Sequence, residues 1–140
     1  DAFIHCWKAK YTYFNERPSS YVKQHIDPTW TQYWPEPPFP AFPSGHSIHS
    51  AAAAAVLTDL FGESFPFTDH SHEGKRRYEN DPRFFYFFYP ARSYSSFWDA
   101  ANESAYSRFL GGIHTKQDND VGQQEGKKVG ENVNALNWKK

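Results

Sequence analysis

The stretch FPSGHSIHSAAAAAVL, residues 42–57, decides the fold because it joins a tight turn directly to a run of five alanines. Alanine has the highest intrinsic helix propensity, so the run predicts a helix over residues 46–61 that ends at Gly62. The free N–H groups and positive dipole end at such a helix start favour an anion, and His46 adds a titratable group beside them. Taken alone, the stretch fits better with an ordinary helix start and a half-exposed histidine.

The composition is that of one compact domain, or of one piece of a larger one, with 140 residues and a net charge of −1. This charge gives no reason to expect nucleic acid or an anionic membrane as a partner. Aromatic residues make up 19% of the chain, and Cys6 has no second cysteine to pair with. Aromatic packing rather than disulfides is therefore expected to hold the fold together. The longest apolar stretches fall far short of the roughly 20 residues needed to span a bilayer, so no membrane span is expected.

The start of the chain predicts that an N-terminal part is missing. The sequence contains no Met, and Asp1 opens what looks like the middle of a helix without a cap before it. We interpret the chain as a fragment or processed product of a longer protein. Any signal peptide would belong to the missing part, so the localisation stays open, with a periplasmic or secreted location as the working expectation.

The N-terminal and central segments predict helices joined by long aromatic loops. Residues 1–16 are expected to form a helix that Pro18 ends, because the residue before a proline is pushed out of the helical conformation. Residues 18–43 are rich in proline and tryptophan, and residues 63–95 hold an aromatic cluster at 84–89. Both segments are expected to be loops, the cluster packing on a hydrophobic surface.

Two further helices are expected in the C-terminal half. Ser96 is a candidate N-cap for a helix through Phe109, which Gly111 and Gly112 would break. A last helix is expected from about residue 121 to residue 136. Its apolar side chains form a stripe at irregular helical spacing: Val121, Val129, Val133 and Leu136.

Two pairs of residues could each converge on one ligand. Lys10 and Arg17 are seven residues apart, so on one helix they would lie within about 20° of each other and about 10 Å apart along the axis. Arg108 and His114 flank residues 111–112, two glycines that let the chain turn back sharply. Each pair alone also fits an ordinary surface: a solvated basic face, or a helix-end arginine with a surface histidine.

Together the segments form an ordered pattern that is far more specific than any of its parts. The pattern is Lys10-x6-Arg17-Pro18, then Pro43-Ser44-Gly45-His46, then Ser107-Arg108-x5-His114-x3-Asp118. With every position matched, it resembles the signature of the vanadium-dependent haloperoxidases and of the type 2 phosphatidic acid phosphatases that share their fold. The runs PPFPAFPSGHS and GGIH…DNDVGQQEGKKVGENVNAL resemble the bacterial haloperoxidase-like branch.

The resemblance implies a fold and a place within a larger protein. It implies an all-α helical bundle of the vanadium haloperoxidase and acid phosphatase type. It further implies that residues 1–140 are a single C-terminal catalytic segment whose N-terminal helices are absent. That missing part of the same protein is then an expected partner, and a homo-oligomer is left open.

The resemblance also implies the residues that hold vanadate. Lys10, Arg17 and Arg108 would donate charge-assisted hydrogen bonds to its oxygens, for which the rigid arginine fork is well suited. Ser44 and the backbone N–H of Gly45 would add neutral donors at the mouth of the helix.

Two histidines and one carboxylate complete the implied site. His114 would be the vanadium ligand in a haloperoxidase, or the nucleophile in a phosphatase. His46 would be the acid–base group that deprotonates hydrogen peroxide or protonates a leaving alcohol. Asp118 would orient a histidine or an arginine from behind.

These residues support three functional hypotheses. The first is a vanadate-dependent haloperoxidase that oxidises bromide or iodide with hydrogen peroxide to a hypohalous acid, with vanadium as a Lewis acid. The second is a phosphomonoesterase with His114 as the nucleophile. The third is a non-catalytic oxyanion-binding fragment, since a segment without its N-terminal helices could lack activity.

The resemblance draws attention to the residue seven positions before the acid–base histidine, which is Phe39 here. In the family this position faces the vanadate pocket, where algal bromoperoxidases carry His and chloroperoxidases carry Phe. The chloroperoxidase pattern also has a Trp two residues earlier, where this chain has Pro37. We therefore expect iodide and bromide turnover, with chloride turnover weak or absent.

Three other histidines are weaker candidates for the site. His49 lies one helical turn after His46 and could line the site, although a packed core histidine is the more ordinary interpretation. His70 and His72 stand beside acidic residues in TDHSHEG, but the spacing matches no structural zinc pattern. A substrate-side or plain loop role is expected for that pair.

Overall fold

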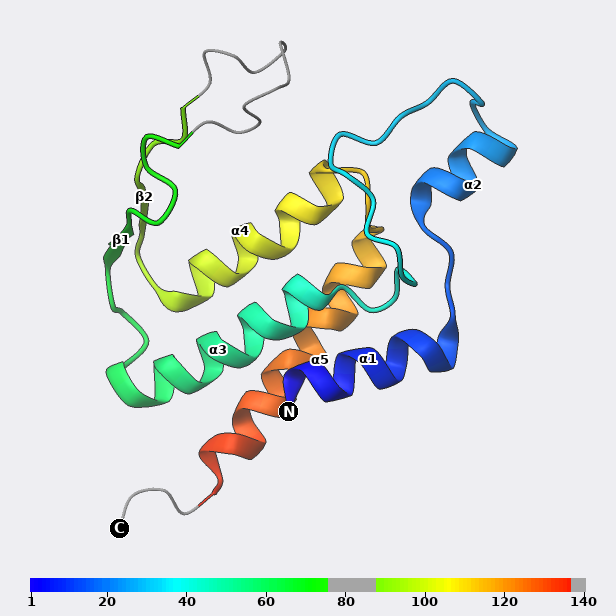
Figure 1. Cartoon of the computed structure of the whole chain (residues 1–140). Coiled ribbons are helices and arrows are strands. Elements are labelled where there is room, and N and C mark those ends of the chain that lie inside the picture. Colours follow the sequence, from blue (N-terminus) through cyan, green and yellow to red (C-terminus); the bar gives the residue numbers. More distant parts are fainter. Residues whose placement is uncertain (76–87, 137–140) are drawn as a thin grey trace.

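The computed structural model describes residues 1–75 and 88–136, and within these ranges the chain is helical apart from one small two-stranded sheet. The expected all-α class is thereby confirmed. The elements follow in the order α1 (Ala2–Tyr13), α2 (Pro18–His25), α3 (Gly45–Phe61), β1 (Phe67–Asp69), β2 (Arg92–Tyr94), α4 (Phe97–Leu110) and α5 (Lys116–Asn134) (Figure 1).

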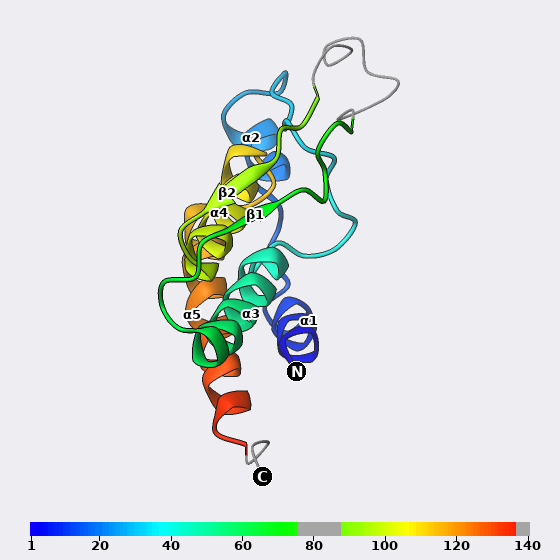
Figure 2. The same ribbon diagram turned by 90° about the vertical axis from the view of Figure 1, so that its left-hand side faces the viewer.

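The alanine-rich helix α3, which the sequence predicts, is the centre of the bundle. It packs most extensively against α5, then against α4 and α1, and the two views show these helices gathered around it (Figures 1 and 2). Its small side chains let the neighbouring helices approach closely, and Gly62 follows its last residue as expected. The buried residues of the helix are Ser47, Ile48, Ala51, Ala52 and Ala54.

Helix α5 meets α3 through glycines. Gly122, Gly126 and Gly130 are buried at four-residue spacing on one face. A Cβ atom at Gly126 would lie 2.2 Å from the carbonyl oxygen of Ile48, so a larger residue would force the two helices apart. The apolar stripe lies outside this glycine face: Leu136 is exposed and the three valines are half-buried.

The start of α5 also differs from its expected position. The helix begins at Lys116, five residues before the expected residue 121, because Thr115 and Asp118 form a capping box. The hydroxyl of Thr115 accepts from the backbone N–H of Asp118, and the carboxylate of Asp118 accepts from the backbone N–H of Thr115. The cap places Asp118 in the first turn of the helix.

The N-terminal segment corrects the expected single helix over residues 1–16. Helix α1 ends at Tyr13, because Phe14 adopts a left-handed conformation with φ of 52°. Arg17 then becomes the N-cap of α2, whose first residue is Pro18. The expected loop over residues 18–43 therefore begins with a helix, which a proline favours at its first position.

The segment after α3 carries a short antiparallel sheet that the sequence did not predict. Strands β1 and β2 pair Phe67 with Tyr94, and their rings lie 5.3 Å apart. Of the aromatic cluster, residues 84–87 lie outside the described residues. In the same described ranges, the helices fall short of the length and apolar character that crossing a membrane requires.

Helix α4 confirms the expected cap and end. The hydroxyl of Ser96 accepts from the backbone N–H of Asp99, and the helix ends at Leu110, just before Gly111. The last turns of α1 and α4 and the first turns of α3 and α5 lie toward the same end of the bundle (Figure 1). The sequence motifs sit at these helix ends, so the fold gathers them.

Candidate functional site

A cavity of about 160 Å³ lies at this end of the bundle. Its lining includes Lys10 from α1, Phe39 from the following loop, Gly45 and His46 from α3, Arg108 from α4, and His114 from just before α5. The structure therefore brings residues from all three sequence motifs to one place.

Lys10 is a buried cation held by a loop. Its side chain is 1% exposed, and Nζ donates to the carbonyl oxygens of Pro40 at 2.8 Å and Ala41 at 2.7 Å. Burial lowers the pKa of Lys10 to about 8. Because an ammonium group has three donors, one N–H remains for a ligand.

Arg17 donates hydrogen bonds to the same loop. It donates to the carbonyl oxygens of Phe39 at 2.9 Å, Pro40 at 3.3 Å and Ile113 at 2.8 Å, and to Nε2 of His114 at 3.1 Å. Four of the five guanidinium donors are used, and one N–H of Nη2 remains.

The shared loop explains why Lys10 and Arg17 converge. The expected reason, a common face of one helix, is wrong, because Arg17 lies beyond the end of α1. The carbonyl oxygens of residues 39–41 draw both cations together instead. The ring of Phe39 lies beside both, 5.4 Å from Nζ of Lys10 and 5.2 Å from Cζ of Arg17.

His114 is held at both ring nitrogens. Nδ1 lies 3.3 Å from Oδ2 of Asp118, and Nε2 lies 3.1 Å from Nη1 of Arg17. A carboxylate can only accept and a guanidinium can only donate, so Nδ1 carries the proton and Nε2 carries the lone pair. Burial lowers the pKa of His114 to about 4, although Asp118 acts in the opposite direction. The ring is therefore neutral at pH 7.

Asp118 is fixed by its place in the capping box. Its Oδ2 accepts from the backbone N–H of Thr115 at 2.8 Å as well as from His114. Burial alone would raise the pKa of Asp118, but the hydrogen bonds from His114 and Thr115 outweigh it and hold the pKa below its ordinary value. The carboxylate is thus ionised and oriented before any ligand arrives.

The start of α3 contributes the third part of the site. Ser44 is the buried N-cap, and its hydroxyl accepts from the backbone N–H of Ser47. His46 is exposed at the cavity. The protein atoms around its ring, followed by the positive charge of Arg108, lower the pKa of His46 to about 4. His46 is therefore a neutral base at pH 7.

Arg108 depends on a residue that the sequence analysis missed. Its guanidinium carbon lies 5.7 Å from the centre of the Trp34 ring, and the backbone N–H of Trp34 donates to the carbonyl oxygen of Gly111 at 3.0 Å. A Cβ atom at Gly111 would lie 1.6 Å from the Trp34 ring, so only glycine leaves room for the indole. Of the two glycines at the expected turn, Gly112 adopts a positive φ of 71°.

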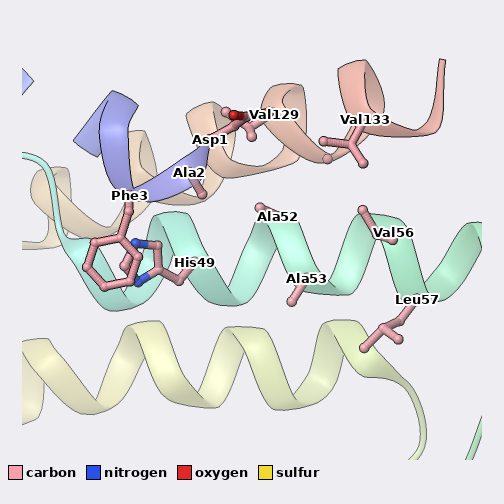
Figure 3. A pocket seen from close by; sticks show the side chains of 11 residues that line it. Asp1, Ala2, Phe3, His49, Ala52, Ala53, Val56, Leu57, Val129 and Val133 are labelled. Carbon is pink, nitrogen blue, oxygen red and sulfur yellow. The ribbon is translucent and has the colours of Figure 1, made fainter. Parts of the chain in front are cut away.

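His49 borders two cavities at once. Its ring stacks on Phe3 at a centroid distance of 3.7 Å, and it lines both the 160 Å³ cavity and an apolar groove of about 600 Å³. The groove runs between the start of α1, α3 and α5 (Figure 3). His49 is thus a packed histidine, as expected, that also borders the site.

The histidines of the segment before β2 lie elsewhere. Nδ1 of His70 lies 2.7 Å from Oε2 of Glu73, and both side chains are exposed. His72 packs against Tyr89. Across residues 1–75 and 88–136, no three metal-binding side chains of His, Cys, Asp or Glu cluster together.

The donor chemistry of the cavity fits a tetrahedral oxyanion. Lys10 and Arg17 are buried cations and Arg108 adds a third, whereas Asp118 is the buried acid among the described residues. The surplus positive charge and the remaining N–H donors call for an anion with several acceptor oxygens. His114 presents the Nε2 lone pair to the same region.

Comparison with known proteins gives one matching family model and several similar solved structures. The family model for the VCPO second helical-bundle domain matches residues 22–138. The crystal structure of the first bacterial vanadium-dependent iodoperoxidase is 42% identical, with a TM-score of 0.80. The match covers 96% of this chain but 30% of that chain.

More distant structures show the same fold. Holo and apo crystal structures of a bacterial vanadium-dependent chloroperoxidase superpose with TM-scores of 0.77 and 0.76 at 18% identity. The matches cover 92% and 93% of this chain, and 31% and 32% of those chains. A comparison with curated protein sequences gave no match.

Proposed function

Because the chain belongs to the family of the VCPO second helical-bundle domain, we propose that it carries the vanadate site of a haloperoxidase. The proposed reaction is the oxidation of iodide or bromide by hydrogen peroxide to a hypohalous acid. The observation that carries the proposal is His114, a neutral histidine whose Nε2 lone pair lies beside buried cations. An electron pair next to surplus positive charge is suited to a ligand that is both a Lewis acid and an oxyanion.

The proposed roles follow from the donors that remain free. Lys10 and Arg17 each offer one N–H, and Arg108 adds a third cation on the α4 side of the cavity. Ser44 and the backbone N–H of Gly45 would complete the donors at the start of α3. Nε2 of His114 would bind the vanadium in place of the hydrogen bond that it accepts from Arg17, and this N–H of Arg17 would then turn to an oxygen of the oxyanion. Bound vanadate supplies a Lewis acid that activates hydrogen peroxide toward a halide.

Residues of this chain would take up the proton that hydrogen peroxide releases and hold the proton of His114 in place. His46 is neutral at pH 7, so one of its ring nitrogens can take a proton from incoming hydrogen peroxide. Asp118 keeps the proton of His114 on Nδ1, so Nε2 carries the lone pair, which accepts from Arg17 until a ligand takes its place. The ring of Phe39 packs edge-on against Trp7 at 4.7 Å and excludes water from one side of the cations.

We propose iodide and bromide as substrates, with chloride oxidised weakly or not at all. Similarity to an iodoperoxidase at 42% identity supports iodide. Chloride is the hardest of the three halides to oxidise. The chloroperoxidase pattern has a Trp where this chain has Pro37. Without that indole, the site is expected to lose activity toward chloride before activity toward bromide or iodide.

We also propose that residues 1–140 work as one C-terminal segment of a longer catalytic protein. The chain spans 30% of the length of the iodoperoxidase that it matches. Helix α1 and the residue that follows it expose large apolar side chains that further protein could cover: Ile4 is 71%, Tyr11 59% and Phe14 70% exposed. Comparing the isolated segment with the full-length protein in the same halogenation assay tests this proposal, which predicts activity only in the latter.

The direct test of the function pairs two reactions. Full-length protein is stripped of vanadate, reconstituted, and assayed for triiodide formation and bromination, beside hydrolysis of p-nitrophenyl phosphate. Peroxide-dependent halogenation that disappears on stripping and returns with vanadate supports the proposal. Phosphate hydrolysis without halogenation would instead support the phosphomonoesterase, in which Nε2 of His114 attacks phosphorus. Oxyanion binding with neither activity would leave an oxyanion-binding protein.

A further inference from the structure

Two buried polar residues behind Ser44 have no role in the site described so far. Ser47 is 0% exposed on α3, and Asn119 is 4% exposed on α5. Ser47 Oγ lies 2.9 Å from Ser44 Oγ and 3.2 Å from the amide oxygen of Asn119. Buried polar groups are costly unless their hydrogen bonds are made. The donors and acceptors of these three hydrogen-bonded side chains can therefore be assigned.

The hydroxyl of Ser44 receives two hydrogen bonds. Its oxygen accepts from the backbone N–H of Ser47 at 3.4 Å and from the Ser47 hydroxyl at 2.9 Å. A hydroxyl oxygen has two acceptor positions and one proton. With both acceptor positions filled from Ser47, the proton of Ser44 has to point away from Ser47.

The amide of Asn119 determines where Ser47 sends its proton. Ser47 has one hydroxyl proton and cannot donate it to both Ser44 and Asn119. In the orientation drawn, Nδ2 of Asn119 is buried with no hydrogen-bond partner among the described residues. Turning the amide by 180°, which exchanges nearly equivalent atoms, lets Nδ2 donate to Ser47 and frees the Ser47 proton for Ser44.

We propose that Asn119 and Ser47 are positioning residues that fix the Ser44 hydroxyl as a donor toward the oxyanion. The hydrogen bonds then run in one direction, from Asn119 to Ser47 to Ser44 to the ligand. This inference rests on the proposed function, since it concerns the same oxyanion. It adds two residues that lie outside the three sequence motifs.

The close packing of α5 on α3 fixes the relative positions of Ser44, Ser47 and Asn119. The backbone N–H of Ser44 donates to the carbonyl oxygen of Asp118 at 3.0 Å. A Cβ atom at Gly122 would lie 2.8 Å from Cβ of Ser47 and 2.9 Å from the carbonyl oxygen of Ser44. Consecutive residues at the start of α5 thus serve two parts of the site: Asp118 orients His114, and Asn119 orients Ser44 through Ser47.

The test measures equilibrium binding of vanadate and, separately, of inorganic phosphate to the full-length protein. Ser47→Ala removes the hydroxyl but keeps the backbone N–H that donates to the N-cap Ser44. We expect binding of either anion to weaken about 5- to 20-fold. This is less than the roughly 10- to 150-fold effect of losing a donor to a charged acceptor, because the Ser44 hydroxyl stays but is no longer oriented. Ser50→Ala is the matched control, because Ser50 makes a similar 3.0 Å serine–serine bond to Ser104 one turn further on. This control is expected to leave anion affinity unchanged.

A double-mutant cycle separates positioning from general damage. In a Ser44→Ala background, Ser47→Ala is expected to change anion affinity less than 2-fold, because the donor that it orients is already gone. An equal loss with and without Ser44, or no loss in the single variant, overturns the inference. Thermal unfolding of each variant confirms that the folded protein is being compared.

Measuring both vanadate and phosphate lets this inference fail separately from the proposed function. A wild type that binds phosphate but not vanadate overturns the vanadate proposal, and the Ser47 cycle measured with phosphate still decides the inference. A wild type that binds neither anion overturns both.

Discussion

Nη1 of Arg17 lies 3.1 Å from Nε2 of His114, although 97 residues separate the two in the chain. Arg17 is held there by carbonyl oxygens of two loops, and Asp118 holds the opposite side of the His114 ring. The contact fixes the tautomer of His114 from both nitrogens. It also places a cation next to the electron pair that we propose as the vanadium ligand, so ligand and counter-charge are oriented together.

Replacing His46 is expected to separate binding from turnover. His46→Ala removes the proposed base without touching the buried cations or His114. We expect vanadate to remain bound while the halogenation rate falls by about 10²- to 10⁴-fold, the usual range for one general base. Steady-state bromination and vanadate binding on the same preparation check this. Loss of vanadate itself would show that His46 is a ligand or a structural residue.

Asp118 is expected to act through the tautomer of His114. Asp118→Asn keeps the shape of the side chain but no longer forces the proton onto Nδ1, so vanadate affinity should fall about 10- to 100-fold. Thr115→Ala is the matched control, because it weakens the same cap at a cost of about 1 kcal/mol, while the hydrogen bonds of the His114 ring are made by Arg17 and Asp118. Equal vanadate affinities in the two variants would contradict this role for Asp118.

Vanadate affinity is expected to fall at high pH because of Lys10. The pKa of Lys10 is about 8 in the ligand-free site, and a bound anion raises it by stabilising the charged form. Binding therefore takes up a proton above pH 8, and affinity should fall up to tenfold per pH unit there, while below pH 8 this dependence is absent.

A Lys10→Met variant isolates that effect. The protonation of the oxyanion itself changes binding to both proteins alike, so the difference between wild type and variant reports on Lys10. Binding titrations from pH 6 to pH 10 should give curves that converge as pH rises. Parallel curves across the range would mean that Lys10 does not titrate there.

Phe39 is expected to tune the halide reaction. Its ring lies beside Lys10 and Arg17, and replacing it with an imidazole adds a proton donor and admits water near both cations. Phe39→His should therefore change the relative iodide and bromide rates without abolishing either. Competition assays with the three halides measure this, and efficient wild-type chlorination at mildly acidic pH would contradict the expected preference.

The sequence predicted the parts of the fold that depend on local signals. The alanine run gave α3 with its Gly62 end, and the side chain of Ser96 gave the cap of α4. The start of α5 was missed although Thr115 and Asp118 have the spacing of a capping box, a signal that was readable in advance. Pro18, the first residue of α2, was likewise a signal of a helix start.

The parts that could not be predicted depend on contacts between distant segments. The convergence of Lys10 and Arg17 was foreseen for the wrong reason, because the carbonyl oxygens that gather them belong to a loop without periodicity. The role of the glycine face of α5 becomes visible only when it is packed against the backbone of α3. The same holds for Asn119, whose partner is Ser47, 72 residues away.

Binding of vanadate to His114→Ala, measured by equilibrium titration of the full-length protein beside halogenation, tests the central claim most directly. His114 Nε2 is the proposed bond between protein and vanadium, while the cations would still attract a free oxyanion. We therefore predict loss of vanadate-dependent halogenation and of tight vanadate binding, with phosphate affinity reduced far less. Halogenation that persists with unchanged vanadate affinity would contradict the account.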